Sequence, residues 1–180
     1  MKLQTIDKAL YRKRLNIALV SCVAILLITS LSVSNILIAL LGSDVEGENF
    51  WWNVWGVIAG AGVIVGLFKV VAAKPFMAEI NYVRSLKKEM NRIYRSSKKL
   101  QVALEANDKN AIIISYFNLQ ASKQVYQLDN NTLTMDELNE KIRVLDEKIA
   151  ELGLSVSLDD YRSGLINELG NNKLSNNDED

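Results

Sequence analysis

Two long apolar stretches dominate the first half of the chain. They run from Leu15 to Leu41 and from Phe50 to Ala73, and the short polar connection Gly42 to Asn49 joins them. Each exceeds the roughly 20 apolar residues that a helix needs to cross the hydrocarbon core of a bilayer. The first has no charged residue, and the second has only Lys69. The pattern predicts a transmembrane helical hairpin.

Two alternatives to that hairpin arise from the same pattern. A helix that is apolar on every side can also be a buried core helix, but the rest of this 180-residue chain has too little apolar material to enclose two of them. The first stretch could instead be a cleaved secretory signal, because Ser32-Val33-Ser34 resembles a cleavage site. Signal h-regions span only about 7–15 residues, whereas this run continues to Leu41. Length therefore favours two retained membrane helices.

The second half of the chain is amphipathic, with helical spacing of its apolar residues. Residues 76–106 follow a heptad register, which predicts one long helix with a packing seam of coiled-coil type. The seam consists of Phe76, Glu79, Val83, Leu86, Met90, Ile93, Ser97, Leu100 and Leu104. Asn107-Asp108 then interrupts this helix and can cap the next one. That helix, from Lys109 to Leu128, is apolar on more than one side, so we expect it to lie between two others.

Two further helices are expected after the turn residues Asp129-Asn130-Asn131. Thr134 and Glu137 have the spacing of a capping box, and Gly153 is typical of a helix C-terminus. Apolar residues repeat between them, at Leu138, Ile142, Leu145, Ile149 and Leu152. Because a helix of this length is marginal alone in water, its seam should pack on the earlier helices. A short last helix is expected to begin at Ser157 or Asp159 and to end at Gly170.

The predicted fold class is all-α: a two-helix transmembrane hairpin followed by a cytosolic antiparallel helical hairpin or three-helix bundle. The expected segments are a basic cytosolic N-terminus (1–14), membrane helix 1 (15–41), a short acidic outer loop (42–49), membrane helix 2 (50–73), a cytosolic helical domain (74–170) and a disordered acidic tail (171–180).

Charge on either side of the apolar stretches predicts their orientation. The connection holds three acidic residues and no Lys or Arg, whereas both flanks are basic. The positive-inside rule then places both termini in the cytoplasm. The residues expected at the two membrane interfaces are Arg12, Lys13, Arg14, Lys69 and Lys74 on the inner side and the aromatic belt Trp51, Trp52 and Trp55 on the outer side. The stem of Lys69 can snorkel to the headgroups, although a buried functional charge is the alternative.

Glycines give the second stretch a candidate helix-packing face. Gly56 to Gly60 and Gly62 to Gly66 are small-xxx-small steps, which allow helix backbones to approach closely. This face could pack on the chain's own first span or mediate homodimerisation, and it could be wide enough for both.

Basic residues form a stripe opposite the seam of the first amphipathic helix, at Arg84, Lys88, Arg92, Arg95 and Lys99. One hypothesis is a solvated surface. Another is attraction to anionic lipid headgroups, at about 1 kcal/mol per nearby Lys or Arg. Nucleic-acid binding is disfavoured, because no aromatic interleaving or nucleic-acid motif accompanies the charges.

Candidate chemistry is sparse. The chain has no histidine, which removes the commonest general base and most zinc sites. Its one cysteine, Cys22, lies inside the first span, where it is expected to be a small apolar residue. Neither span carries Asp, Glu, His or Arg, which proton- or ion-coupled transporters normally need. We therefore expect no enzyme, no catalytic residue, no metal site and no cofactor.

The chain resembles a bacterial family of short two-pass inner-membrane proteins catalogued only as a domain of unknown function. The resemblance covers about residues 1–165. It rests on Ile6-Asp7-Lys8, Tyr11-Arg12, Asn49-Phe50-Trp51, Pro75-Phe76-Met77-Ala78-Glu79, Asn91-Arg92-Ile93-Tyr94-Arg95 and Tyr126-Gln127-Leu128-Asp129-Asn130-Asn131-Thr132. It implies a place in the bacterial inner membrane and no particular activity.

Pattern and resemblance together predict a membrane-anchored scaffold or interaction module. The expected partners are the bilayer and a protein or a second copy, bound through the second span or the cytosolic helices. The alternatives are an accessory subunit of a larger membrane complex and, less favoured, an enzyme acting on lipid or a membrane peptide.

Overall fold

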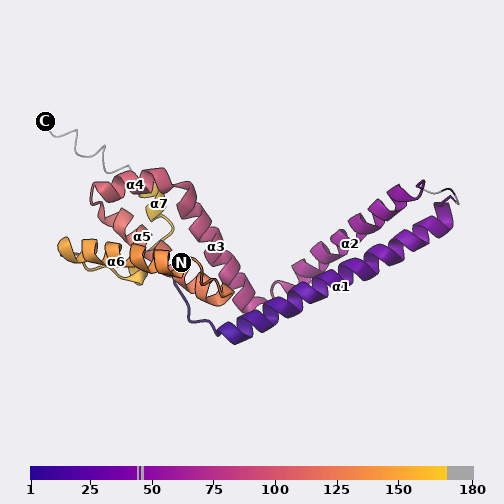
Figure 1. Cartoon of the computed structure of the whole chain (residues 1–180), viewed down its shortest axis with the longest axis horizontal. Helices are drawn as coiled ribbons and strands as arrows, with labels where there is room; N and C mark the ends of the chain where they lie inside the picture. The colour runs from indigo at the N-terminus through magenta and orange to yellow at the C-terminus, as the bar shows by residue number, and fades with distance from the viewer. Residues whose placement is uncertain (44, 46, 170–180) are drawn as a thin grey trace. The chain divides into compact units, whose positions relative to one another are not determined.

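The computed structural model describes residues 1–43, 45 and 47–169. It is 78 % helical, with no strand in the described residues, and two long apolar helices precede all the others. The all-α fold class is thereby confirmed (Figure 1). The helices are α1 (Lys8–Leu41), α2 (Phe50–Val71), α3 (Ala78–Arg95), α4 (Ser97–Glu105), α5 (Lys109–Asp129), α6 (Met135–Glu151) and α7 (Leu165–Glu168), with 3₁₀ turns η1 (Pro75–Met77) and η2 (Leu158–Asp160).

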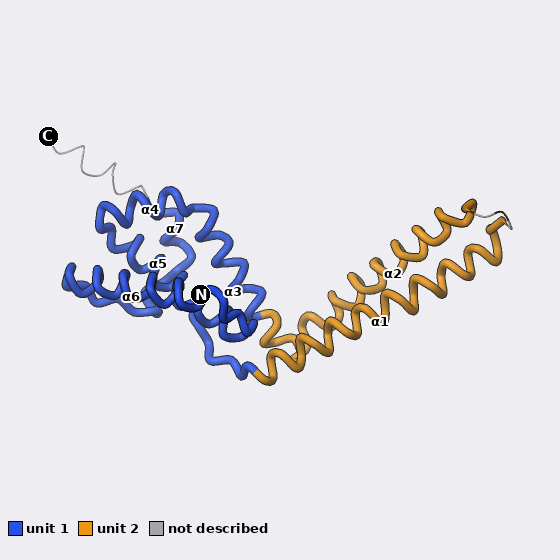
Figure 2. Tube along the Cα trace, viewed as in Figure 1, with its two compact units in different colours: residues 1–8, 82–180 blue, residues 9–81 orange. Residues whose placement is uncertain are grey.

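The chain forms two compact units (Figure 2). One, which we call the hairpin unit, comprises residues 9–81. The other, which we call the helical domain, comprises residues 1–8 together with the chain from Tyr82 onward.

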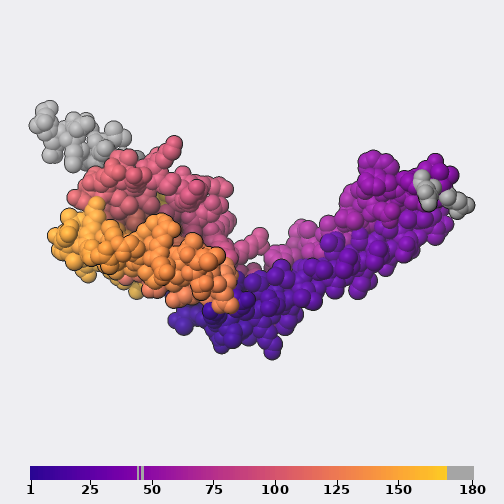
Figure 3. Space-filling view, viewed as in Figure 1, coloured from indigo at the N-terminus to yellow at the C-terminus, as the bar shows by residue number. Residues whose placement is uncertain are grey.

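The hairpin unit is built on α1 and α2. Both helices are long and apolar enough to cross a membrane, and only 6 % and 11 % of their most apolar windows is buried within the protein. On the face shown in Figure 3, the side chains of both helices reach the surface along their length. The helix α1 begins at Lys8, before the apolar stretch, so the basic residues that flank the stretch are themselves helical. At the other end, Asn49 brackets the connection: its side chain accepts from the Ser43 N–H at 3.0 Å and donates to the Ser43 carbonyl at 2.7 Å.

The single helix predicted over residues 76–106 is wrong. The structure has η1, α3 and α4 instead, and the chain leaves helical geometry at Ser96, where φ is −99° and ψ is 11°. Consecutive serines, Ser96 and Ser97, favour a helix boundary because their hydroxyls compete for backbone hydrogen bonds. The seam itself survives the break, since Val83, Leu86, Ile93 and Leu100 are all buried.

The central element of the helical domain is α5. Asp108 caps it by accepting a hydrogen bond from the Ala111 N–H at 2.9 Å, as the sequence predicts. Asn130 ends it in the left-handed conformation, with φ of 56°. Residues around the whole circumference of α5 are buried, among them Ile112, Ile113, Ile114, Phe117, Ala121 and Val125. The expectation that this helix lies between others is confirmed.

The helix α6 packs along α5. Leu138, Ile142 and Leu145 are buried, so the predicted return of this seam onto the earlier helices is confirmed. The predicted capping box at Thr134 is wrong: its φ of −106° and ψ of 7° depart from the extended backbone of a cap, and its side chain makes no capping bond.

A glycine ends α6 as predicted. Gly153 is left-handed, with φ of 61°, and its N–H donates to the Ala150 carbonyl at 3.0 Å. A capping box does form further on, where Ser157 and Asp160 bond each other's backbone N–H groups around η2. The expected last helix is reduced to η2 and the four residues of α7. Gly170 and the predicted tail lie outside the described residues.

Candidate functional site

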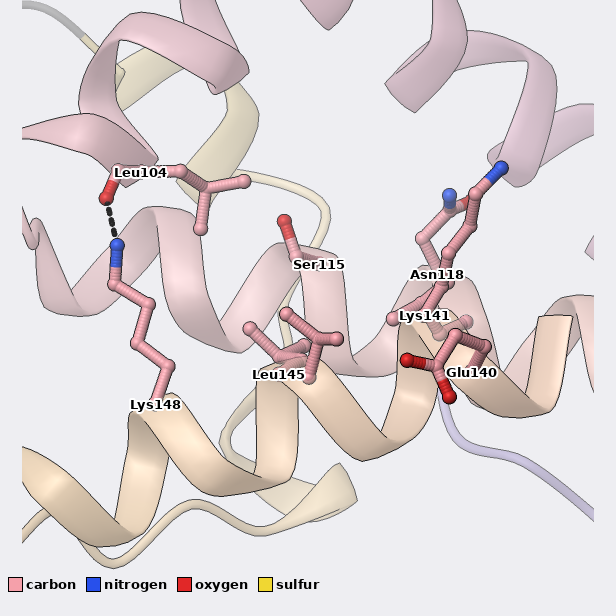
Figure 4. A pocket seen from close by; sticks show the side chains of 9 residues that line it. Leu104, Ser115, Asn118, Glu140, Lys141, Leu145 and Lys148 are labelled. Atoms are coloured by element: carbon pink, nitrogen blue, oxygen red, sulfur yellow. Dashed lines mark hydrogen bonds between the residues drawn. The ribbon is translucent and has the colours of Figure 1, made fainter. Parts of the chain in front are cut away.

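An apolar hollow that could receive a partner lies on the helical domain between α4, α5 and α6 (Figure 4). It is a groove of about 420 Å³. Its lining residues are Leu104, Ser115, Asn118, Leu119, Glu140, Lys141, Val144, Leu145 and Lys148. In Figure 4, Ser115 and Leu145 lie in the middle, with Leu104 and Lys148 at one end and Asn118, Glu140 and Lys141 at the other. The groove therefore has an apolar centre and polar ends.

Lysine 148 fixes one wall of this groove. Its ammonium donates to the Leu104 carbonyl at 2.5 Å, and that carbonyl belongs to the last turn of α4. A cation at the C-terminal end of a helix is favoured by the helix dipole. Lys148 thus ties α6 to α4. Val144, one turn before Lys148 on α6, also lines the groove, and 53 % of its surface stays exposed.

The N-terminal segment of the chain occupies a second site on the helical domain. The Gln4 N–H donates to the Tyr82 hydroxyl at 2.8 Å, and the Gln124 amide donates to the Gln4 carbonyl at 2.5 Å. The Tyr82 hydroxyl in turn donates to Gln124 Oε1 at 2.9 Å. We call this arrangement of Gln4, Tyr82 and Gln124 the backbone clamp. It binds both the backbone N–H and the backbone carbonyl of Gln4, in the segment that precedes α1.

Apolar and ionic contacts support the backbone clamp. Met1 and Leu3 pack against the hydrophobic core of the helical domain, and Lys2 forms an exposed ion pair with Asp159 at 2.6 Å. Sequence reasoning missed this site and treated residues 1–14 as one basic segment. A backbone-directed contact between residues 120 positions apart leaves no periodic signal.

A buried phenol–carboxylate pair joins α3 to the chain after η2. The Tyr161 hydroxyl donates to Glu89 at 2.6 Å, and the Tyr161 ring stacks on Phe117 with centroids 3.8 Å apart. Burial and the adjacent Glu89 carboxylate raise the pKa of Tyr161 above its usual range. Desolvation would raise the pKa of Glu89, but hydrogen bonds from Ser163 and Tyr161 and the charge of Arg92 outweigh it and lower that pKa. The Tyr161 phenol therefore keeps its proton and the Glu89 carboxylate stays charged. This combination favours the hydrogen bond that holds the chain after η2 against α3.

The candidate glycines separate into two pairs. A Cβ added at Gly56 would meet the Ser34 Oγ at 2.0 Å and the Ser30 carbonyl oxygen at 2.6 Å. At Gly60 the nearest atoms belong to Leu26, at 3.0 Å and 3.2 Å. Both glycines therefore lie against α1. Gly62 and Gly66 have no heavy atom of another element within 4 Å of such a Cβ, so they face away from α1.

The residues expected at the membrane interfaces lie near the ends of the hairpin helices. Trp51 and Trp55 are 67 % and 55 % exposed, and Trp52 is half-buried. Lys13, Lys69 and Lys74 are exposed, and Arg12 is half-buried.

Arg14 has a specific set of partners within the hairpin unit. It is half-buried, forms an ion pair with Glu79, donates to the Pro75 carbonyl at 2.9 Å and lies over the Phe76 ring at 5.8 Å. The polar seam position Glu79 thus has its counter-ion on α1.

Within residues 1–43, 45 and 47–169, no three His, Cys, Asp or Glu side chains converge on a point that could hold a metal ion. What the structure defines is a helical protein with an exposed apolar hairpin and a helical domain carrying a groove and an occupied clamp. The family model described as "Protein of unknown function (DUF3087)" matches residues 1–166, so the chain belongs to this family. Comparison with curated proteins and with solved structures found no match.

Proposed function

We propose that this chain is a two-pass protein of the bacterial inner membrane, with both termini in the cytoplasm, that acts as an anchored scaffold through its helical domain. The observation that carries the proposal is the exposure of the apolar side chains of α1 and α2, such as Val20 at 69 % and Leu40 at 73 %. Exposed apolar surface on this scale marks an interaction or membrane site. The charge asymmetry around the two helices supports the orientation.

The groove between α4, α5 and α6 is the surface that we propose for a protein partner. Its apolar centre and charged ends match the usual anatomy of an interface, with an apolar middle and a polar rim. Catalysis is not part of the proposal, because the sequence lacks histidine and the buried phenol–carboxylate pair holds its proton. The proposal also includes no cofactor and no nucleic-acid partner.

Cysteine labelling tests the anchor and its orientation. In a variant in which Cys22 is replaced by Ala, Val45→Cys should react with a membrane-impermeant thiol reagent added to intact cells, and Leu133→Cys should react only after lysis. Both positions are exposed, so accessibility depends on the side of the membrane. Labelling of Leu133→Cys in intact cells would contradict the orientation, and release of the chain by alkaline extraction would contradict the anchor.

Purification in mild detergent tests the groove. Val144→Arg places charge in the apolar groove, whereas Asn139→Arg places the same charge on an exposed part of α6 away from it. We expect Val144→Arg alone to lose a partner or self-association that the wild type retains at fixed stoichiometry. Equal behaviour of the two variants would remove the groove from the proposal.

An accessory subunit of a larger membrane complex is the alternative, and Gly62 and Gly66 favour it. Their face of α2 is open, and small residues let a second helix approach closely. Gly62→Leu with Gly66→Leu should then release a larger membrane protein from the purified complex while self-association persists. Retention of that protein would exclude this face as its binding site.

A further inference from the structure

Basic side chains gather on the outer face of α3 and continue into α4. Arg84, Lys88 and Arg95 are spaced so that they share the side of α3 opposite the buried Leu86 and Ile93, and all three are exposed. Lys98 and Lys99 follow in the first turn of α4 and are exposed as well. We call these five residues the basic face.

Ion pairing distinguishes four residues of the basic face from the exposed basic residues of α6. On α6, Lys141 pairs with Glu137 at 2.7 Å, and Arg143 pairs with Glu140 and Glu147. By contrast, Lys88, Arg95, Lys98 and Lys99 form no ion pair with any described residue. Lys141 and Arg143 are thus neutralised within α6, while these four cations of α3 and α4 have no acidic partner in the part of the chain that the structure describes.

The positions of Lys98 and Lys99 are not explained by stabilisation of α4. The first turn of a helix carries the positive end of its dipole, where cations are unfavourable, and α4 has no acidic residue in that turn. Tyr94, beside Arg95, is 75 % exposed, and tyrosine is enriched where a protein meets the headgroup layer of a bilayer.

We propose that the basic face binds the anionic headgroups of the membrane in which the hairpin is anchored. The proposal rests on the proposed membrane anchor. Only residues 72–77 separate the end of α2 from the start of α3 in the sequence, so the anchor keeps this face at high effective concentration near a lipid surface. Anionic lipids attract polybasic segments next to a membrane helix, within about one Debye length, or about 8–10 Å at physiological salt. Charge complementarity and this tether favour lipid over an acidic protein.

Fluorescence quenching in nanodiscs tests the proposal on the full chain. With Cys22 replaced by Ala, a fluorophore at Asn91→Cys reports on the basic face, because Asn91 is exposed on the same side of α3. A second fluorophore position, Asn139→Cys on α6, serves as the reference. The nanodiscs contain a headgroup-labelled quencher lipid in either zwitterionic lipid or a mixture with about 30 % anionic lipid. We expect quenching at position 91 to rise in the anionic discs, to fall back in about 1 M salt, and to exceed quenching at position 139.

Matched charge variants separate lipid binding from net charge. Lys88→Gln, Lys98→Gln and Lys99→Gln together should lower the ratio of membrane-bound to free helical domain by on the order of 100-fold, or about fivefold per cation. Lys109→Gln, Lys123→Gln and Arg143→Gln remove the same charge elsewhere and should change that ratio by less than about twofold. Equal quenching of position 91 in both lipid mixtures, or an equal loss in the two triple variants, would overturn the proposal. Failure of the chain to co-elute with the nanodiscs would overturn the anchor itself, which is a different result.

Discussion

The hairpin unit and the helical domain use the same secondary structure in opposite ways. Trp51 on α2 is 67 % exposed, whereas Phe117 on α5 is fully buried. In the helical domain, apolar residues recur along one side of most helices, so neighbouring helices of the same chain can cover them. In the hairpin they surround each helix, so the chain has nothing to cover most of them with. The comparison teaches that the distribution of apolar residues around a helix, more than their number, decides how many of them its own unit can bury.

Close packing between helices also differs in kind between the two units. The core of the helical domain is filled by large side chains, including Leu86, Ile93 and Phe117. In the hairpin, α1 and α2 meet where Gly56 and Gly60 have no side chain of their own and make room for Ser34 and Leu26 of α1. This is the packing expected in a bilayer, where burial of apolar surface gives no driving force between helices.

Removing a phenylalanine ring from each unit should give the largest difference between them in the free energy of unfolding. Phe117→Ala leaves a cavity under Tyr161 and should lower the free energy of unfolding of the helical domain by about 3–5 kcal/mol. Phe50→Ala removes a ring that is 61 % exposed and should leave that domain's unfolding unchanged. Denaturant titration in detergent, followed by tyrosine fluorescence and circular dichroism, measures both. Similar losses in the two variants would mean that the units do not unfold separately.

Glycine substitutions sharpen the comparison within the hairpin. Gly56→Leu forces bulk against Ser34 and the Ser30 carbonyl, so helix association should weaken by about 1–3 kcal/mol. Gly62→Leu is the matched control, since its site is open, and it should leave the α1–α2 contact unchanged. Cross-linking between cysteines placed on α1 and α2 measures the contact. Equal loss in both variants would mean that α1 covers more of α2 than the Gly56 and Gly60 side.

The helices and their buried sides could be predicted from sequence wherever the cause is local. Apolar spacing gave the limits of α5 to within a residue, and Asp108 and Gly153 marked helix ends through their own backbone and side-chain chemistry. Competition between local signals explains the failures. Thr134 and Glu137 have the spacing of a capping box, yet the cap forms at Ser157, where the backbone is extended. The break at Ser96 was hidden because the heptad register continues through it.

Individual hydrogen bonds between distant residues could not be predicted. The Tyr161–Glu89 bond joins residues 72 positions apart, and the backbone clamp joins residues up to 120 apart. Their pairing depends on how α3, α5 and the chain ends pack, and one sequence holds no signal for that. The glycine motif shows the same limit: spacing marked four glycines as equal candidates, and only the structure assigns Gly56 and Gly60 to α1.

Acidity and alkalinity should both weaken the docking of Tyr161. The pKa of Glu89 is lowered on folding, so its contribution is present above its ordinary pKa of about 4.3 and is lost as pH falls through the lowered value. The pKa of Tyr161 is raised, so its contribution is present below about pH 10 and is lost as pH rises toward the raised value. Tyr161→Phe keeps the stacked ring and should cost about 1.5 kcal/mol near neutral pH.

Measuring the free energy of unfolding as a function of pH tests whether the Tyr161–Glu89 contribution weakens at both low and high pH. The difference between wild type and Tyr161→Phe should be flat between about pH 6 and 9 and should narrow on both sides. Tyr126→Phe is the control, because that half-buried tyrosine packs against the same core. A difference that is constant from pH 3 to about 11 would mean that the hydroxyl acts without its ionised partner.

The smallest expected effect lies at the backbone clamp, where the start of the chain is hydrogen-bonded to the helical domain. Gln124→Leu removes the donor to the Gln4 carbonyl and the acceptor for Tyr82, while Met1 and Leu3 keep their apolar contacts. Because Gln4 is exposed, water can replace the lost bonds, and the cost should be only about 0.5–1.5 kcal/mol. Hydrogen exchange is the suitable measurement, since the Gln4 N–H should exchange faster while amides in the middle of α5 keep the wild-type rate. Gln120→Leu, one turn earlier on α5 and beside the same segment, is the matched control and should leave the Gln4 amide protected. Uniformly faster exchange along α5 in Gln124→Leu would show that the N-terminal segment holds the helical core together, and the clamp would then belong to the core of the fold.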